Sequence, residues 1–365
     1  MKKALITGIS GQDGSYLAEL LLSKNYEVHG TIKRNSIKEN SFIRIESIQN
    51  HVTLHYADLT DIASLISVVQ KVKPDEIYNL AAQSDVRVSF DQPLYTANAT
   101  GIGTLNLLEA VRQLNLNPKI YQASSSEMFG NSIDSDGYQR ETTPMHPVSP
   151  YGCAKVYSYN IARNYRNAYG MYISNGILFN HESPRRGTNF VTNKVCKEAV
   201  RIYLGLTDEL RLGNLDATRD WGHAKDYVEA MWMILQAEES EDWVIATGKT
   251  TKIRDFVKMA FEYVGIELEF SGSGVAEVAK VAKCNNLNYQ LEIGKEVLAI
   301  DSKYFRPTEV DLLIGDPTKA KEKLGWVPEI TVQEMCAEMV REDLEQAIKG
   351  ALLKMHGYKI SISAE

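Results

Sequence analysis

Three glycines near the start of the chain limit what it can fold into. Gly8, Gly11 and Gly14 follow a short apolar run at residues 2–7 and precede the amphipathic run at 15–24. Glycine lets such a turn tighten and lets backbone N–H groups approach a pyrophosphate at a helix N-terminus. A lone glycine pattern is a weak signal, but one that stands between a strand and a helix has the context of a dinucleotide site. The alternative is a plain glycine turn.

Strand and helix patterns alternate through the first half of the chain. Further strands are expected at 26–31, 52–56, 76–81, 119–123 and 171–178, a long helix at 95–114, and a helix that ends near Tyr169. This alternation predicts an α/β fold, a Rossmann doubly wound parallel sheet with right-handed crossovers.

The pattern loosens after residue 180. Helices are expected near 192–205, 224–237, 251–264 and 331–349, and a mobile loop at 270–276. We therefore assign residues 1–180 to a dinucleotide-binding Rossmann domain, to which about 212–250 return. Residues 181–365 form mainly a smaller mixed α/β substrate-binding lobe, because this part lacks the glycine pattern.

Composition excludes several classes of protein. The chain has 365 residues, a net charge of −7 and no basic block, which argues against nucleic acid as a partner. No run reaches the ~18 apolar residues of a membrane span, and the first apolar run is too short for a signal peptide. The four cysteines are far apart and form no C-x-x-C pair, as expected of free thiols in a cytoplasmic protein. The seven histidines show no metal-ligand spacing, so no metal is expected.

A tyrosine and a lysine stand four residues apart at the start of the helix that ends near Tyr169. Tyr151 and Lys155 would share one helix face, where the ammonium favours the phenolate and lowers the pKa of the tyrosine. Such a tyrosine can take a proton from a sugar or alcohol hydroxyl. Hydroxyls and a carboxylate, at 124–127, follow the strand at 119–123, where open α/β sheets bind ligands. Taken alone, the Tyr/Lys spacing could be chance.

Basic residues follow the second expected strand, where an NAD-selective site carries an acidic residue. Cationic and hydroxyl groups suit a 2′-phosphate, so this loop favours NADP; the alternative is an ordinary basic loop. Its residues are Lys33, Arg34, Asn35 and Ser36. After the third strand, Asp58 could cap an adenine amino group or serve as the N-cap of the next helix, and the sequence does not separate the two.

Several motifs together resemble one family of sugar-nucleotide enzymes. They are Thr7-Gly-Ile-Ser-Gly-Gln-Asp-Gly14, Ser125-Ser-Glu127, Tyr151 with Lys155, Phe179-Asn-His-Glu-Ser-Pro-Arg-Arg-Gly187 and Arg219-Asp-Trp-Gly-His223. The chain resembles the GDP-mannose 4,6-dehydratase family of extended short-chain dehydrogenases/reductases over essentially its whole length. The loop at 179–187 is highly specific, whereas the glycine and Tyr/Lys motifs are shared across the superfamily.

The resemblance implies a redox-neutral dehydration of a GDP-sugar on tightly held NADP. Tyr151 would deprotonate the sugar 4-hydroxyl, with Ser125 linking the two, and hydride would pass from C4 to the nicotinamide. The 4-ketone acidifies C5, whose proton Glu127 would remove before the 6-hydroxyl leaves as water and hydride returns to C6. Lys155 would hold the nicotinamide ribose.

The same resemblance implies two sets of binding residues and a homotetramer. The cofactor set comprises Gly8, Ser10, Gly11, Gln12, Asp13, Gly14, Arg34, Asn35, Ser36, Asp58, Leu59, Leu80, Ala81, Ala82, Ser84, Tyr95, Tyr151, Lys155, His181 and Arg186. The substrate set comprises Ser84, Asp85, Ser126, Asn180, Lys194, Arg219, Arg306 and Glu309.

The chain departs from the family pattern around the expected sugar pocket. Ser125 stands where the family usually has Thr, Asp85 where it has His, and Val148 where it commonly has Arg; the stretch 131–140 is about two residues longer. Smaller side chains would leave room beyond C6. GDP-D-glycero-D-manno-heptose is therefore a rival to GDP-D-mannose, and a nucleotide-sugar epimerase or reductase of the same fold is a second alternative. Glu127 argues against the epimerase, which needs no base for C5.

Overall fold

The structure is a computed structural model that describes residues 1–34, 42–286, 289–305 and 308–357. It divides into two compact units. The first unit comprises 1–181, 220–250 and 310–329, and the second comprises 182–219, 251–309 and 330–365. The sequence places the first boundary one residue earlier and the return segment at about 212–250. It does not indicate that residues 310–329 also belong to the first unit.

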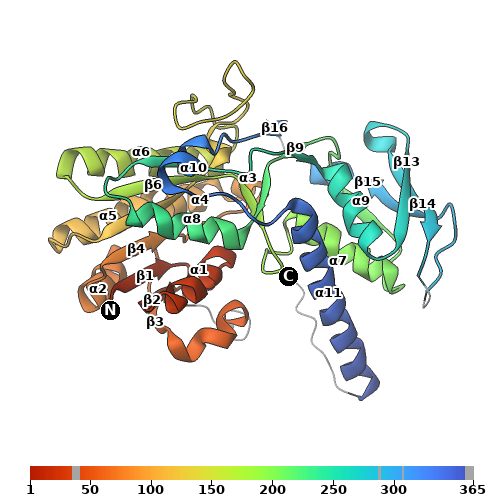
Figure 1. Cartoon of the computed structure of the whole chain (residues 1–365), viewed down its shortest axis with the longest axis horizontal. Helices are drawn as coiled ribbons and strands as arrows, with labels where there is room; N and C mark the ends of the chain where they lie inside the picture. The colour runs from red at the N-terminus through yellow and green to blue at the C-terminus, as the bar shows by residue number, and fades with distance from the viewer. Residues whose placement is uncertain (35–41, 287–288, 306–307, 358–365) are drawn as a thin grey trace. The chain divides into compact units, whose positions relative to one another are not determined.

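A seven-stranded parallel sheet forms the centre of the first unit (Figure 1). Its order is β11-β6-β5-β4-β1-β2-β3, and every neighbouring pair is parallel. This confirms the predicted Rossmann fold. The strands are β1 (Lys3–Thr7), β2 (Glu27–Ile32), β3 (Thr53–Tyr56), β4 (Glu76–Asn79), β5 (Lys119–Ser125), β6 (Ile173–Leu178) and β11 (Asp242–Ile245).

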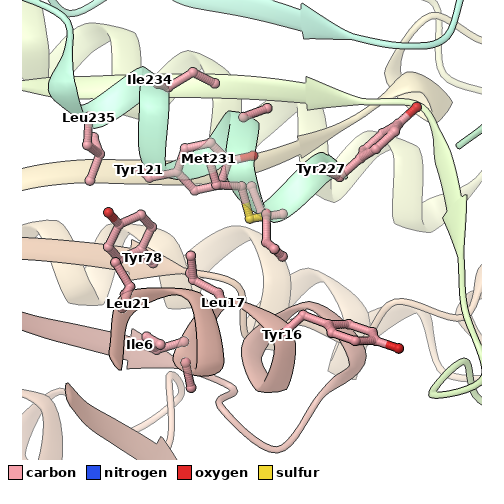
Figure 2. Close-up of a cluster of buried hydrophobic side chains, with 14 of the residues drawn as sticks. Ile6, Tyr16, Leu17, Leu21, Tyr78, Tyr121, Tyr227, Met231, Ile234 and Leu235 are labelled. Carbon is pink, nitrogen blue, oxygen red and sulfur yellow. The ribbon is translucent and has the colours of Figure 1, made fainter. Parts of the chain in front are cut away.

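Helices cover both faces of this sheet because successive strand residues point to opposite sides. Ile6, Tyr78 and Tyr121 pack in one cluster with residues of α1 (Gln12–Ser23) and α8 (Ala224–Gln236), as Figure 2 shows. Leu5 and Ile77 pack on the other face, in a cluster with residues of three more helices. These are α2 (Ile62–Val72), α5 (Gly103–Gln113) and α6 (Pro150–Tyr169).

The helix expected at 95–114 is not one regular α-helix. It begins as α4 (Pro93–Thr96), passes through a π-helical segment, η2 (Ala97–Ile102), and continues as α5. A π-helical turn is an insertion inside an α-helix, which a 3.6-residue periodicity does not reveal. The remaining elements of the first unit are short: η1 (Ile43–His51), α3 (Val86–Asp91), η3 (Ser126–Met128), β10 (Trp221–His223), β16 (Leu312–Leu313) and α10 (Thr318–Leu324). β7 (Asn180–Glu182) lies at the boundary of the two units.

The second unit combines three packed helices with a four-stranded sheet. The helices α7 (Val191–Tyr203), α9 (Ile253–Tyr263) and α11 (Val332–Met355) contact one another. The sheet has the order β13-β14-β15-β8, with β13 (Ile266–Ser271), β14 (Val278–Cys284), β15 (Glu296–Ile300) and β8 (Leu210–Leu212). Short elements complete it: β9 (Thr218–Arg219), β12 (Thr251–Lys252), η4 (Gly274–Ala276) and η5 (Ser302–Tyr304).

The prediction of a mobile loop at 270–276 is partly wrong. Phe270 and Ser271 form the end of β13, and residues 274–276 form a short 3-10 helix. Exposure alternates along β13, the period of a strand buried on one face. None of the described helices is both long and apolar enough to span a membrane.

Candidate active site

The glycine motif forms a turn between β1 and the N-terminus of α1. Gly8 has a φ of +72°, and the Gly11 N–H donates to the Gly8 carbonyl at 2.9 Å. A Cβ on Gly14 would lie 2.4 Å from the Gly8 carbonyl oxygen, so the turn has no room for a side chain there. The N-cap residue of α1 is Gly11, which has no side chain to cap the helix, and the N–H groups of a helix N-terminus attract anions. This turn fits the pyrophosphate of a dinucleotide.

The loop after β4 lies directly beside this turn. Thr7 Oγ1 accepts the N–H groups of Leu80 and Ala81 at 3.0 and 3.1 Å, and a Cβ on Gly8 would lie 3.0 Å from the Ala81 Cα. β1 and β4 are neighbours, so both loops leave the same carboxyl edge of the sheet. A cofactor bound at the glycine turn would therefore also meet the loop after β4.

The rest of that loop is polar. Ser84 is exposed, while the Asp85 side chain caps α3 by accepting the Val88 N–H at 3.1 Å. Gln83 is absent from the predicted binding residues, although it is the polar residue between Ala82 and Ser84. Its Nε2 donates to the Asp85 carbonyl at 3.0 Å, and its Oε1 is buried without a hydrogen-bond partner in the described part of the chain. A bound ligand with a donor would satisfy this oxygen.

Asp58 does not cap the next helix, because Asp61 is the N-cap of α2. Asp58 instead accepts two hydrogen bonds from Thr60 and pairs with Lys33 at 3.0 Å. Burial raises the pKa of Asp58, but the Thr60 and Lys33 hydrogen bonds outweigh it and the net pKa is lowered. Lys33 also donates to the Tyr95 hydroxyl at 3.3 Å. Lys33, although exposed, is thus paired at this corner, and the neighbouring Arg34 is exposed as well. The predicted sites Asn35, Ser36 and Arg306 lie outside the described residues.

Ser125 and Glu127 lie at the carboxyl end of β5. Ser125 is the last residue of the strand and caps η3, where its Oγ accepts the Glu127 N–H at 3.3 Å. The Glu127 side chain is buried, with a residue exposure of 7%. Ser126 is buried beside it. The turn thus places a carboxylate and a hydroxyl at the ligand-binding edge of the sheet.

Tyr151 and Lys155 lie on the first turns of α6. Pro150 and the Ser149 cap, whose Oγ accepts the Gly152 N–H at 3.0 Å, start this helix. Lys155 Nζ lies 5.7 Å from the centre of the Tyr151 ring and donates to the Ala123 carbonyl of β5 at 2.7 Å. Burial lowers the pKa of Lys155 to about 8, against an opposing effect of Asp13. α6 contacts η3, so the hydroxyl, carboxylate, phenol and ammonium share one end of the first unit.

His181 joins the glycine turn to the end of β6. Its Nε2 lies 2.9 Å from Asp13 Oδ2, and its Nδ1 lies 2.8 Å from the Phe179 carbonyl. The ring stacks on Tyr227 with the centroids 4.6 Å apart. Next to it, Asn180 Oδ1 is buried, and the described residues offer it no hydrogen-bond partner.

The predicted residues of the second unit also have defined contacts within it. Arg186 pairs with the buried Glu182 at 3.0 Å, and Arg219 donates to Glu309 at 3.1 Å. Lys194 donates to the Arg211 carbonyl at 2.6 Å. Two predicted substrate residues, Arg219 and Glu309, are therefore brought together although they are 90 positions apart.

The remaining predicted cofactor residues follow the same strands. Leu59 is buried after β3, and Ser10 and Gln12 belong to the glycine turn and the start of α1. Over the described residues, no group of three or more His, Cys, Asp or Glu side chains could hold a metal ion.

Comparison of the whole sequence with known proteins identifies one family. The profile of the family described as GDP-mannose 4,6 dehydratase matches residues 5–339. A GDP-mannose 4,6-dehydratase of Yersinia enterocolitica is 56% identical, covering 100% of both chains. The human GDP-mannose 4,6 dehydratase is 51% identical over 94% of this chain and 91% of its own length.

Solved structures share the fold at low identity. UDP-glucose 4-epimerase from Thermotoga maritima with UDP-glucose has a TM-score of 0.76 at 24% identity, covering 94% of this chain and 99% of that chain. dTDP-glucose 4,6-dehydratase from Bacillus anthracis in complex with NAD has a TM-score of 0.75 at 20% identity, covering 95% and 98%. These structures show the fold, and the profile match and the full-length relatives show that the chain belongs to the GDP-mannose 4,6-dehydratase family.

Proposed function

We propose that the protein is an NADP-dependent GDP-sugar 4,6-dehydratase that converts GDP-D-mannose to GDP-4-keto-6-deoxy-D-mannose with loss of water. The observation that carries the proposal is the buried Glu127 beside the helix that holds Tyr151 and Lys155. The Yersinia and human relatives named for this reaction support it.

The first proton transfer is assigned to Tyr151. Its phenol would take the proton of the sugar 4-hydroxyl, with the Ser125 hydroxyl as the link between them. Lys155 lies near the phenol and carries a charge that favours the phenolate. Because burial lowers the pKa of Lys155 to about 8, this lysine is poised near neutral pH.

The second proton transfer is assigned to Glu127. Once C4 carries a ketone, the C5 proton is acidic and Glu127 removes it. The same carboxyl then protonates the 6-hydroxyl, which leaves as water. After hydride has reached C6, C5 takes up a proton from solvent and Tyr151 releases its proton to solvent. The residue before Glu127 in this turn is Ser126, which has no carboxyl group. Glu127 therefore serves as both the base and the acid. This step separates a dehydratase from a 4-epimerase of the same fold.

The glycine turn suits a nicotinamide dinucleotide, because Gly14 has no side chain and the start of α1 can pack tightly against the main chain of Gly8 and Ile9. When bound, this cofactor accepts hydride from C4 of the sugar and returns it at C6. The turn, the 80–84 loop, Lys155 and His181 would hold it. Arg34 favours NADP over NAD, because its guanidinium suits a 2′-phosphate.

GDP-D-glycero-D-manno-heptose differs from GDP-D-mannose by one carbon beyond C6. Val148, which stands where the family commonly has Arg, packs against the cluster that contains Met128 and Phe129. Asp85 is occupied as the cap of α3. We therefore place GDP-D-mannose first and keep the heptose as the alternative substrate.

A homotetramer is proposed as the working assembly, to be tested by light scattering.

The test compares the wild type with Glu127→Gln on both GDP-sugars in deuterated water. The wild type should give a dehydrated product with deuterium at C5. The variant keeps the size of the side chain but loses the proton acceptor, so it should reduce bound NADP by at most one equivalent and then stop. Dehydrated product from a folded Glu127→Gln protein at a normal rate would move the C5 base elsewhere. Steady consumption of NADPH by the wild type would instead indicate a reductase.

A further inference from the structure

An aspartate stands where a bound dinucleotide would bring its own negative charge. Asp13 lies in the first turn of α1, and the N-terminus of a helix attracts anions. A carboxylate beside a pyrophosphate would weaken binding by repulsion. The structure shows where this carboxylate goes: Oδ1 accepts from Gln12 Nε2 at 3.0 Å, and Oδ2 faces His181 Nε2 at 2.9 Å.

The contacts of His181 determine its protonation. Nδ1 faces the Phe179 carbonyl at 2.8 Å, and Nε2 faces the Asp13 carboxylate. Both partners are acceptors, so both ring nitrogens must donate, and this requires the imidazolium form. A neutral ring would place a lone pair against one of the two oxygens.

Further contacts fix the ring and the main chain of His181. The ring stacks on Tyr227 at an interplanar angle of 21°, and Tyr227 packs edge-on against Trp326. Gln12 Nε2 donates to the His181 carbonyl at 3.1 Å while it also donates to Asp13. Gln12, Asp13 and His181 thus form one hydrogen-bonded unit across 168 positions of sequence.

We propose that Asp13 is a positioning residue, whose carboxylate keeps His181 protonated and in place beside the pyrophosphate of the dinucleotide. The charge of Asp13 is then balanced by the imidazolium, so Asp13 repels the pyrophosphate less and a positive charge lies near the N-terminus of α1, which attracts the anion. This inference rests on the proposed NADP site.

Three other ionisable groups interact with Asp13 or His181. Tyr227 of α8 faces the imidazolium, and Asp13 of α1 is its counter-ion. Asp13 also acts on Lys155 of α6 and Tyr121 of β5: burial lowers the pKa of Lys155 and raises that of Tyr121, and the charge of Asp13 raises both.

The test is the sign of the change in NADP affinity for Asp13→Asn, measured with the full chain and no sugar. If Asp13 merely repels the pyrophosphate, removing its charge tightens binding. If Asp13 keeps His181 protonated, binding weakens by about tenfold, because the pyrophosphate loses the attraction of a nearby positive charge. Asp61→Asn is the control, because it removes one carboxylate but leaves an asparagine that can still cap α2.

A second measurement follows the His181 imidazole by NMR across pH in the protein without cofactor. The pKa of His181 should be lower in Asp13→Asn than in the wild type, because the ring loses its counter-ion. An unchanged titration, or tighter NADP binding by the variant, overturns the proposal. If Asp13→Asn does not fold, the wild type alone tests the proposal: a His181 imidazole that is neutral at pH 7 would overturn it. Failure of the wild type to bind any nicotinamide dinucleotide would instead refute the proposed function.

Discussion

Gly152, in the first turn of α6, lies directly against the main-chain carbonyl of Glu127. A Cβ on Gly152 would be 2.8 Å from that oxygen and 2.9 Å from the Pro147 Cβ, closer than real side chains approach. This close packing sets the distance between the turn that carries Glu127 and the helix that carries Tyr151. The two proposed proton-transfer groups therefore depend on a residue without a side chain.

Gly152→Ala should lower the turnover rate about 10–100-fold, because a small displacement of a reacting group is costly. NADP affinity should change less than the turnover rate, because Lys155 of α6 is one proposed cofactor contact but the glycine turn and the 80–84 loop lie elsewhere in the unit. Gly101→Ala is the matched control, because a Cβ there would meet Tyr157 at an ordinary 3.4 Å. Steady-state kinetics and cofactor titration check both variants. Equal turnover for the two alanine variants would show that the Gly152 contact does not position Glu127.

Tyr151→Phe should abolish turnover while NADP stays bound. The phenol is needed for proton transfer, whereas the ring, 8% exposed, keeps its packing. General acid–base groups contribute ~10²–10⁴-fold. Rates and the bound cofactor should be measured on the same preparation, with a thermal melt to show that the variant is folded. A folded variant that retains most of the wild-type rate would refute the role of Tyr151.

Arg34→Ala should weaken NADP binding and leave NAD binding nearly unchanged. A charge-assisted contact to a phosphate is worth about 1.5–3 kcal/mol when well formed. Lys33→Ala is the internal comparison: its ammonium is already paired with Asp58, so it should affect NADP selectivity less than Arg34→Ala. Both cofactors are titrated into protein stripped of nucleotide. Tighter binding of NAD than NADP by the wild type would contradict the assignment of the basic loop.

The stability of the protein without cofactor should rise with pH in a window set by Lys155. Burial lowers its pKa from 10.5 to about 8, so the unfolded chain binds more protons than the folded chain between these values. The penalty for burying the charge is complete below pH 8 and is relieved as the pH rises toward 10.5, by roughly 3 kcal/mol.

Urea unfolding at pH 7.5 and pH 10 measures this difference for the wild type and Lys155→Met. The methionine has no charge to bury, so the gain assigned to Lys155 should be missing from the variant. Other groups that titrate in the window contribute to both proteins and cancel in the comparison. A variant whose stability rises with pH as much as that of the wild type would show that Lys155 is not buried in its charged form.

Local patterns in the sequence were enough to predict the main sheet and the start of the site. The strand–glycine–helix pattern at 3–23 and the helix that ends at Tyr169 depend on neighbouring residues: glycines in a tight turn, and Ser149 and Pro150 at a helix start. Alternation of strands and helices then implies a parallel sheet, whose carboxyl edge collects the loops that carry Ser125 and Glu127.

Other features depend on contacts between residues far apart in the chain, which local patterns do not encode. The sequence suggests that Lys33 binds a phosphate, but in the fold it pairs with Asp58. The π-helical segment before α5 and the return of residues 310–329 to the first unit follow from packing. Asp13 and His181 each belong to a recognisable motif, yet only the tertiary structure brings their side chains within hydrogen-bonding distance. Whether two side chains pair depends on the distance between them in space. For Lys33 with Asp58 and for Asp13 with His181, the fold alone determines that distance.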